Sequence, residues 1–236
     1  MSRISDITKF TLQDYPGKPA CIFWFAGCNM RCKYCHNVEF FDQKDGFLDN
    51  GYLEKFLKSR IGLLDGVVLS GGECTLDPEI KSIVEMIKNL GFLVKIDTNG
   101  LNYEIIRDLV ENNLIDFVAL DFKAKKDKFS SINQIDETRY DDFEKSLLYL
   151  IDKNIKNQVD LEIRTTIHTT LLQEDDINAI IYLLDNLGYK EKYFIQNFKN
   201  DNKATLVDIG DQEYLLNKDK IITPKNFTVG YRNFLW

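Results

Sequence analysis

Three of the five cysteines in this chain of 236 residues lie within eight positions of one another. They are Cys28, Cys32 and Cys35, in the stretch CNMRCKYCHN, and His36 follows the last of them directly. Thiolates at such short spacing are typical ligands of a soft metal ion or of an iron–sulfur cluster. The spacing therefore predicts metal or redox chemistry at this loop.

Three kinds of metal centre are compatible with this loop. Cys32 to His36 match C-x-x-C-H, the haem attachment pattern, but the N-terminus lacks the signal segment that export for haem attachment needs. A zinc site takes four ligands, and His36 follows Cys35 so directly that both side chains rarely reach one tetrahedral ion. A cubane has four irons, so three thiolates leave one iron free for an exogenous ligand. The loop therefore favours a cluster that binds a reactant.

Alternating apolar and helical segments must position these cysteines. Strands are predicted at residues 20–27, 65–70, 91–97, 115–122, 159–167 and 192–197. The clearest helices run from Asp77 and Pro78 to Gly91, and through residues 177–187 to Gly188. Weaker helical patterns lie at residues 53–57, 105–109 and 143–151. About six strand-then-helix units predict an α/β fold with a parallel sheet covered by helices.

Polar clusters follow every predicted strand. They are the three cysteines, SGGE (70–73), DTNG (97–100), DFK (121–123), Arg164 to His168, and Gln196 with Asn197. Strand ends meet at one mouth in a barrel, whereas the outer strands of an open sheet would lie too far away to contribute. We therefore expect a partial (β/α)6 barrel of the TIM type.

We expect a single domain over residues 1–236. Its core is predicted at about residues 18–200, with a hairpin-like lead-in at 1–17 and a C-terminal extension at 201–236. The polar segment 123–139 is expected to be a loop over the site.

The motif C-x3-C-x2-C, with an aromatic residue before its third cysteine, resembles the signature of the radical S-adenosylmethionine (SAM) enzymes. SGGE resembles the second motif of that superfamily, and the resemblance covers about residues 7–200. It implies a radical SAM fold and one [4Fe–4S] cluster held by Cys28, Cys32 and Cys35, which form the catalytic site. It also implies that SAM binds the free iron and is cleaved to methionine and a 5′-deoxyadenosyl radical. Accessory clusters would need about three or four further cysteines, and only Cys21 and Cys74 remain.

The resemblance assigns further cofactor contacts. Tyr34 lies next to the cluster ligands, and Gly71 and Gly72 let the backbone approach the methionine amino group. Glu73 completes this motif. Taken alone, GGE would be a tight strand-to-helix turn.

Charged residues at the next strand ends are implied to contact the same cofactor. Asp97, Asp121 and Lys123 would hold the ribose hydroxyls and the carboxylate, because a sulfonium amino acid needs both charge signs nearby. Alone, each could be a surface ion pair of little weight. Asp97, Thr98 and Asp121 also resemble a monovalent cation site of related activases. Arg164 is expected to point into the barrel, where a ligand carboxylate or an acidic neighbour would satisfy it.

Further motifs resemble one branch of the superfamily. CHN after the third cysteine, DTNG and LDFK are similar to the glycyl-radical-enzyme activases, and residues 10–37 look most like activating proteins of anaerobic ribonucleoside-triphosphate reductase. This implies a glycyl radical enzyme of the reductase or formate-lyase type as partner, and flavodoxin or ferredoxin as electron donor. Asp14 in DYPG would contact the partner's glycine loop, or the motif is a plain Pro-Gly turn. A small-molecule reaction such as deazapurine ring contraction, and a zinc or electron-transfer module, are the alternatives.

Four features stand apart from these motifs. Cys74 replaces the usual proline after GGE and is expected to be a buried thiol, and Cys21 is expected in the core. His168 is expected to have a structural role, and the aromatic ending at residues 226–236 is expected to pack in the core.

Charge and hydropathy exclude two classes of function. The formal net charge is −7 and no basic stripe is present, so we expect no nucleic-acid binding. No stretch approaches about 18 consecutive apolar residues, so we expect no membrane span. The polar N-terminus lacks a signal peptide pattern, which predicts a cytoplasmic protein.

Overall fold

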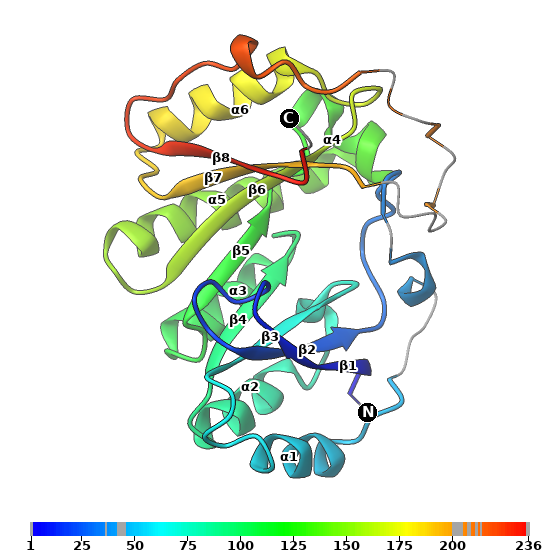
Figure 1. Cartoon of the computed structure of the whole chain (residues 1–236), viewed down its shortest axis with the longest axis vertical. Coiled ribbons are helices and arrows are strands. Elements are labelled where there is room, and N and C mark those ends of the chain that lie inside the picture. Colours follow the sequence, from blue (N-terminus) through cyan, green and yellow to red (C-terminus); the bar gives the residue numbers. More distant parts are fainter. Residues whose placement is uncertain are drawn as a thin grey trace.

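The computed structural model describes residues 2–35, 37–41, 46–199, 205–206, 209–210, 212 and 214–234. Within these residues one sheet runs in the order β1 to β8 (Figure 1). Its strands are β1 (Ile4–Thr11), β2 (Ala20–Phe25), β3 (Gly66–Gly71), β4 (Leu93–Thr98), β5 (Phe117–Asp121), β6 (Asp160–Ile167), β7 (Lys192–Asn197) and β8 (Thr228–Arg232). β1 pairs with β2 in antiparallel fashion, and every later pair is parallel.

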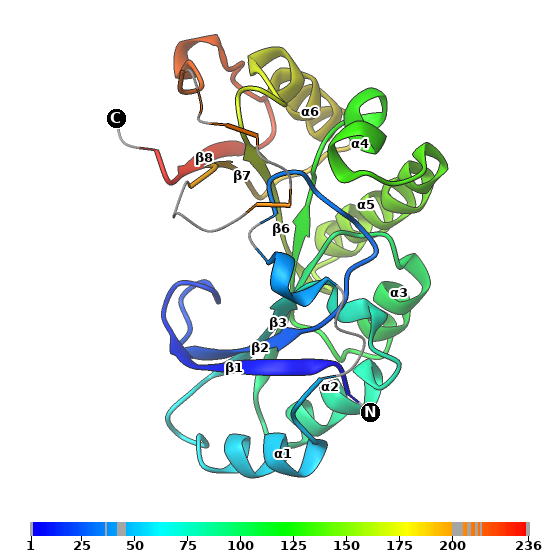
Figure 2. The same ribbon diagram turned by 90° about the vertical axis from the view of Figure 1, so that its right-hand side faces the viewer.

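The helices cover the outer side of the curved sheet, as Figure 2 shows. They are α1 (Asn50–Lys58), α2 (Ile80–Asn89), α3 (Tyr103–Glu111), α4 (Lys126–Asn133), α5 (Tyr140–Ile155) and α6 (Glu174–Asn186). Buried Leu53, Ile83, Leu109 and Leu147 lie on the inner faces of four of them. Together with β2 to β7, these helices confirm the predicted α/β partial barrel.

Two strands were not predicted. β1 lies in the predicted lead-in and β8 in the predicted C-terminal extension, so the sheet is one strand wider on each side. Both are edge strands with few buried residues, and an edge strand need not show the apolar pattern of a central one. β8 packs closely against the Phe194 side chain of β7. A Cβ at Gly230 would lie 2.6 Å from the Phe194 ring, so a glycine is needed there. Phe227, just before β8, is buried as expected for the aromatic ending, and residues 235–236 lie outside the described part.

The segment 123–139 is not a loop as predicted. It contains α4, which buries Phe129 and Ile132 at helical spacing among otherwise polar residues. Two apolar residues give a weak signal, and this explains the wrong prediction. The helix does lie against the cysteine loop, because Arg31 N donates to Asn133 O at 2.9 Å and Lys33 N to Ile132 O at 3.0 Å.

The boundaries of the two clearest helices are nearly as predicted. α2 begins at Ile80 and not at Pro78, because Asp77 caps the preceding turn by accepting the backbone N–H of Glu79 at 2.7 Å. Gly91 and Gly188 follow α2 and α6 at positive φ angles of 88° and 74°. No helix in the described ranges is long and apolar enough to cross a membrane.

Candidate active site at the carboxyl ends of the strands

The three clustered cysteines follow β2 and line one cavity. Cys28 Sγ accepts the backbone N–H of Met30 and Cys35 Sγ that of Asn37, each at 3.4 Å. Burial raises the thiol pKa of Cys28 to about 11 and that of Cys32 to about 12. In the part of the chain that the structure describes, no three Cys, His, Asp or Glu side chains form a ready single-ion site. His36, the fourth residue considered for zinc, lies outside the described residues.

Buried polar atoms beside these cysteines fit an iron–sulfur cluster. Asn29 Nδ2, Tyr34 Oη and Asn133 Nδ2 are buried without a hydrogen-bond partner. Such atoms are rare in native proteins and call for an explanation. The sulfurs of a cluster accept hydrogen bonds, so three thiols with unpaired donors around them match the chemistry of a cluster.

The glycines at the end of β3 are required for packing within the protein. A Cβ at Gly72 would lie 2.0 Å from Gly27 O, and one at Gly71 would lie 2.6 Å from Phe25 N. Gly71 also has a φ angle of 115°, and its carbonyl accepts Asn37 Nδ2 at 3.0 Å. Both glycines line the cavity of the cysteines. Their predicted contact with the methionine amino group therefore stays a proposal.

Glu73 ties two strand ends together. It is 1% exposed and accepts hydrogen bonds from Thr75 N, Thr75 Oγ1, Thr98 Oγ1 and Asn99 N at 2.6 to 3.2 Å. Burial raises the pKa of this carboxyl. The protein thus engages both oxygens of Glu73, as the tight-turn alternative for GGE implies.

Cys74 and Cys21 are buried, as predicted. The Cys74 thiol donates to Asp97 O at 3.7 Å, and burial, followed by the nearby carboxylates of Glu73 and Asp97, raises its pKa well above the ordinary value. Burial also raises the pKa of Cys21 to about 12. Both thiols are therefore protonated at neutral pH.

A largely buried chain of alternating charges lies beside the cysteine loop, and four of its five side chains line the same cavity. Arg164 donates from Nε to Asp121 Oδ1 at 2.6 Å, and its Nη2 lies 3.3 Å from Asp97 Oδ2. Lys123 Nζ donates to Asp121 Oδ2 at 2.8 Å, and Lys95 Nζ contacts Asp97 Oδ1. Arg164 thus points into the barrel and is satisfied by acidic neighbours, which was one of the two predicted possibilities.

These ion pairs keep the two carboxyls ionised. Burial acts to raise the pKa of Asp97 and of Asp121, but Arg164 and the adjacent lysines outweigh it and lower both values. Asp97, Asp121, Lys123 and Arg164 all line the cavity of the cysteines. The structure therefore brings the predicted cofactor residues together.

The predicted monovalent cation site stays a prediction, and the contacts of its three residues do not favour it. The Thr98 hydroxyl donates to Glu73 at 2.8 Å, and Asp97 and Asp121 are both engaged by basic side chains. A further cation would meet three positive groups there. The resemblance could not reveal these contacts, because Lys95, whose ammonium group contacts Asp97, lies outside the DTNG motif.

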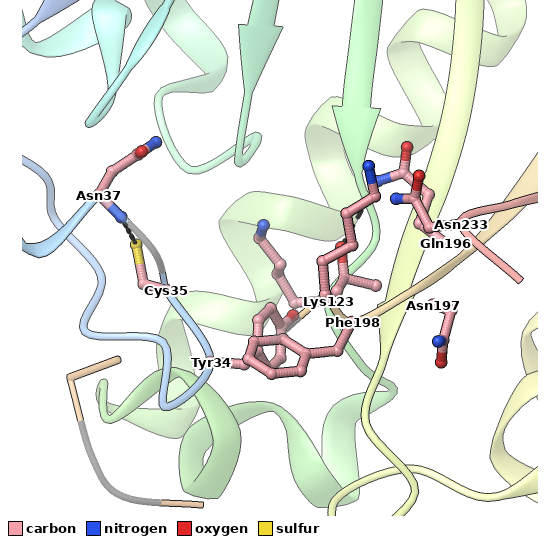
Figure 3. A pocket seen from close by; sticks show the side chains of 10 residues that line it. Tyr34, Cys35, Asn37, Lys123, Gln196, Asn197, Phe198 and Asn233 are labelled. Carbon is pink, nitrogen blue, oxygen red and sulfur yellow. Dashed lines mark hydrogen bonds between the residues drawn. The ribbon is translucent and has the colours of Figure 1, made fainter. Parts of the chain in front are cut away.

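A second cavity adjoins the first beside Cys35 (Figure 3). It is lined by two aromatic rings, by lysines and by hydroxyl and amide side chains. These residues are Tyr34, Cys35, Asn37, Lys123, Thr166, Gln196, Asn197, Phe198, Lys199 and Asn233. They come from the cysteine loop and from the ends of β5 to β8, so the unpredicted strand β8 contributes to the site. Lys123 faces both cavities, and its Nζ lies 5.8 Å from the centre of the Tyr34 ring.

Sequence reasoning missed three charged residues of the interior. Lys95 lies two residues before Asp97, and Glu162 lies two residues before Arg164, so each shares the inner face of its strand. The alternation of inward-facing and outward-facing side chains along a strand could have identified Lys95 and Glu162. Arg232 pairs with Glu162 at 2.7 Å but lies in β8, which was not predicted.

Asp14 lies apart from the site, whereas His168 lines neither described cavity but packs against Phe198, with 5.1 Å between the ring centres. Asp14 accepts the Thr11 hydroxyl in the turn between β1 and β2, at the amino end of β2 and thus opposite to the cysteine loop. The cysteine loop lies at the carboxyl ends of the strands, so the position of Asp14 does not explain how it would contact the glycine loop of a partner. That contact stays a prediction. His168 hydrogen-bonds to Thr170 Oγ1 at 2.7 Å and to Gly210 O at 3.3 Å, in agreement with a structural role.

Comparisons with known proteins agree with this geometry. A family model described as the radical SAM superfamily matches residues 22–186. The chain is 36% identical over 198 residues to a protein of Methanocaldococcus jannaschii named as a candidate glycyl-radical enzyme activating enzyme, covering 83% of this chain and 80% of that protein. It is 32% identical over 202 residues to the pyruvate formate-lyase-activating enzyme of Clostridium pasteurianum, covering 81% and 80%.

A solved structure shows the same fold. The crystal structure of Streptococcus suis SuiB bound to S-adenosylmethionine superposes with a TM-score of 0.62 at 12% identity, covering 90% of this chain. This chain spans 49% of that protein, so the likeness concerns the shared fold alone. The chain therefore belongs to the radical SAM superfamily, in the branch of the glycyl-radical-enzyme activating enzymes, and its cofactors are a [4Fe–4S] cluster and SAM.

Proposed function

We propose that this protein generates the glycyl radical of an anaerobic ribonucleoside-triphosphate reductase. The similarity of residues 10–37 to activating proteins of that reductase supports this partner. A formate-lyase type of glycyl radical enzyme is the second candidate, because a relative of 32% identity is named a pyruvate formate-lyase-activating enzyme. The proposal depends most on one observation: the three clustered thiols and the ion network line the same cavity.

Each part of the cavity has a role in this proposal. Cys28, Cys32 and Cys35 would hold the cluster, which when bound would supply the one-electron reduction of SAM needed to remove the glycine α-hydrogen. Lys123 and Arg164 offer positive charge to the cofactor carboxylate. Because both are held by buried carboxylates, they need little reorganisation when the cofactor binds.

The second cavity is suited to the nucleoside part of the cofactor. Tyr34 and Phe198 provide apolar rings, and Gln196 and Asn197 provide amides that both donate and accept hydrogen bonds. These groups adjoin Cys35, so a ligand that reaches from one cavity into the other remains beside the cluster loop. Position and exclusion of water are the contributions of the protein to such cofactor chemistry.

The unclosed sheet supports a macromolecular substrate. β1 and β8 are the two edges of the sheet and do not pair with one another. A barrel that lacks closure on one side can admit a folded loop of a partner, whereas a closed barrel is filled by its own side chains. We expect the glycine loop to enter at the carboxyl ends of the strands, where Asn233 follows β8.

The experiment is an activation assay without oxygen. The cluster-loaded protein is incubated with SAM, reduced flavodoxin or ferredoxin, and either the anaerobic reductase or pyruvate formate-lyase. Electron paramagnetic resonance is expected to show a glycyl radical on the reductase, and a Cys32→Ser variant should give none. A radical on the formate-lyase alone would assign that partner instead. 5′-Deoxyadenosine without a radical on either protein would refute the proposal.

A further inference from the structure

Lys95 is a buried charge that the proposed cofactor contacts leave unexplained. It is 2% exposed, and its position two residues before Asp97 on β4 places both side chains on the inner face of the sheet. Its Nζ contacts Asp97 Oδ1 and lies 5.9 Å from the centre of the Phe117 ring. A lysine is almost never fully buried unless it is paired, and here the partner is a residue of the cofactor cavity.

Asp97 is held from three strands. Oδ1 meets Lys95 on its own strand, whereas Oδ2 accepts Ser70 Oγ of β3 at 3.1 Å and lies 3.3 Å from Arg164 Nη2 of β6. Without the lysine, one oxygen of a buried carboxylate would lose its charged partner. The carboxylate would then rotate towards another hydrogen-bond donor or bind another cation.

Neutralisation alone does not require this lysine. Lys95, Arg164 and Lys123 contact Asp97 and Asp121, whereas the buried carboxyl of Glu73 in the same cavity is held by hydroxyl and backbone groups. Arg164 and Lys123 would already balance the two carboxylates. The contact with Oδ1 of Asp97 therefore points to a local geometric role for Lys95.

We propose that the Lys95 ammonium group is a built-in cation that positions Asp97 in the cofactor cavity, and that a free ammonium ion can replace it when the side chain is shortened. Lys95 is thus a positioning residue, because it acts on the cofactor through Asp97. The inference rests on the proposed contact between Asp97 and SAM. It does not depend on which protein receives the radical.

The test measures SAM binding to the cluster-loaded protein by calorimetry without oxygen, at constant ionic strength. Lys95→Ala leaves a space for an ammonium ion, whereas Lys95→Met removes the charge and keeps the space filled. We expect both variants to bind SAM about tenfold more weakly, as for the loss of one charged hydrogen bond. About 100 mM ammonium should restore Lys95→Ala to within about threefold and leave Lys95→Met unchanged.

Lys88→Ala is the matched control. Lys88 Nζ pairs with Asp116 at 2.7 Å, before the amino end of β5 and thus away from the cysteine cavity, so this variant should bind SAM as the wild type does, with no response to ammonium. Binding by Lys95→Ala within twofold of the wild type would overturn the proposal. Weak binding that ammonium does not restore, or restores equally in Lys95→Met, would overturn it too.

The wild-type protein provides a test that needs no variant to fold. Its lysine already supplies the cation, so its SAM dissociation constant should be equal in choline, potassium and ammonium chloride to within about twofold. A tenfold preference for potassium or ammonium would show that a free cation is required and would overturn the proposal. Glycyl radical formation plays no part in these readouts, so failure of the proposed partner leaves them unaffected.

Discussion

Replacing Arg164 by methionine tests whether the ion network of Asp97, Asp121 and Arg164 stabilises the fold. The side chain of Arg164 is 17% exposed and contacts two carboxylates, whose side chains are 13% and 22% exposed. Removing one partner of a buried ion pair costs about 3 to 5 kcal/mol, because the other charge stays buried and unpaired. Lys95 and Lys123 still compensate Asp97 and Asp121, so we expect the lower value, about 3 kcal/mol.

This loss should appear as a lower melting temperature. For a domain of this size, 1 kcal/mol corresponds to about 2 to 4 °C, so Arg164→Met should melt roughly 6 to 12 °C below the wild type. Thermal unfolding is followed by circular dichroism on cluster-free, reduced protein, so that iron release does not contribute. Lys81→Met is the control, because its pair with Asp108 is about half exposed and should be worth about 1 kcal/mol at most.

A second substitution separates unpaired charge from lost packing. Asp121 still pairs with Lys123 in Arg164→Met, so adding Asp121→Asn should leave that lysine without its carboxylate and lower the melting temperature further if charge pairing governs the stability. A melting temperature within about 2 °C of the wild type for Arg164→Met would refute the reasoning, because the pairs would then contribute no more than surface pairs do. Equal melting of the single and double variants would assign the loss to packing.

Three further predictions follow from the same contacts. Gly72→Ala should lower stability by at least about 2 kcal/mol in urea unfolding, because its Cβ would lie 2.0 Å from Gly27 O; an unchanged midpoint would contradict this packing. The lowered pKa values of Asp97 and Asp121 stabilise the fold above the ordinary carboxyl pKa of 3.8, and this contribution is lost as the pH falls below it. Urea midpoints should therefore fall more steeply from about pH 5 to pH 3 in the wild type than in a variant with both residues changed to asparagine, and equal slopes would contradict it. Cys74, buried and with a raised pKa, should resist iodoacetamide in the native protein as seen by mass spectrometry, and rapid alkylation would show that it is accessible.

The central strands and the site could be predicted because they carry strong local patterns. β2 to β7 lie within about two residues of their predicted bounds, since each is an apolar run between polar ends. The three clustered cysteines favoured a cluster that binds a reactant over a four-cysteine carrier, and the position of polar residues after each strand predicted that Asp97, Asp121 and Lys123 lie together, as they do in one cavity.

Other features depend on tertiary contacts that a local pattern does not contain. β1 and β8 are edge strands with few buried residues, and the only apolar residues that α4 buries are Phe129 and Ile132. The hydrogen bonds of Glu73 come from the end of β4 and from η2 (Cys74–Leu76), and the motif did not indicate this link between strand ends. Its predicted cofactor contact stays a prediction, and Glu73 lines the cavity of the cysteines. Lys95 could have been found through strand alternation, but only the structure shows its contact with Asp97.

The most direct test of the account is Mössbauer spectroscopy of protein loaded with 57Fe, recorded with and without SAM. Three cysteines should hold about four irons per chain, and one of these irons should change its isomer shift when SAM is added, because it has no protein thiolate. The other three should keep their parameters, and a Cys28→Ser variant should lose the cluster. A single iron bound by thiolates, or a cluster in which SAM changes none of the irons, would contradict the account.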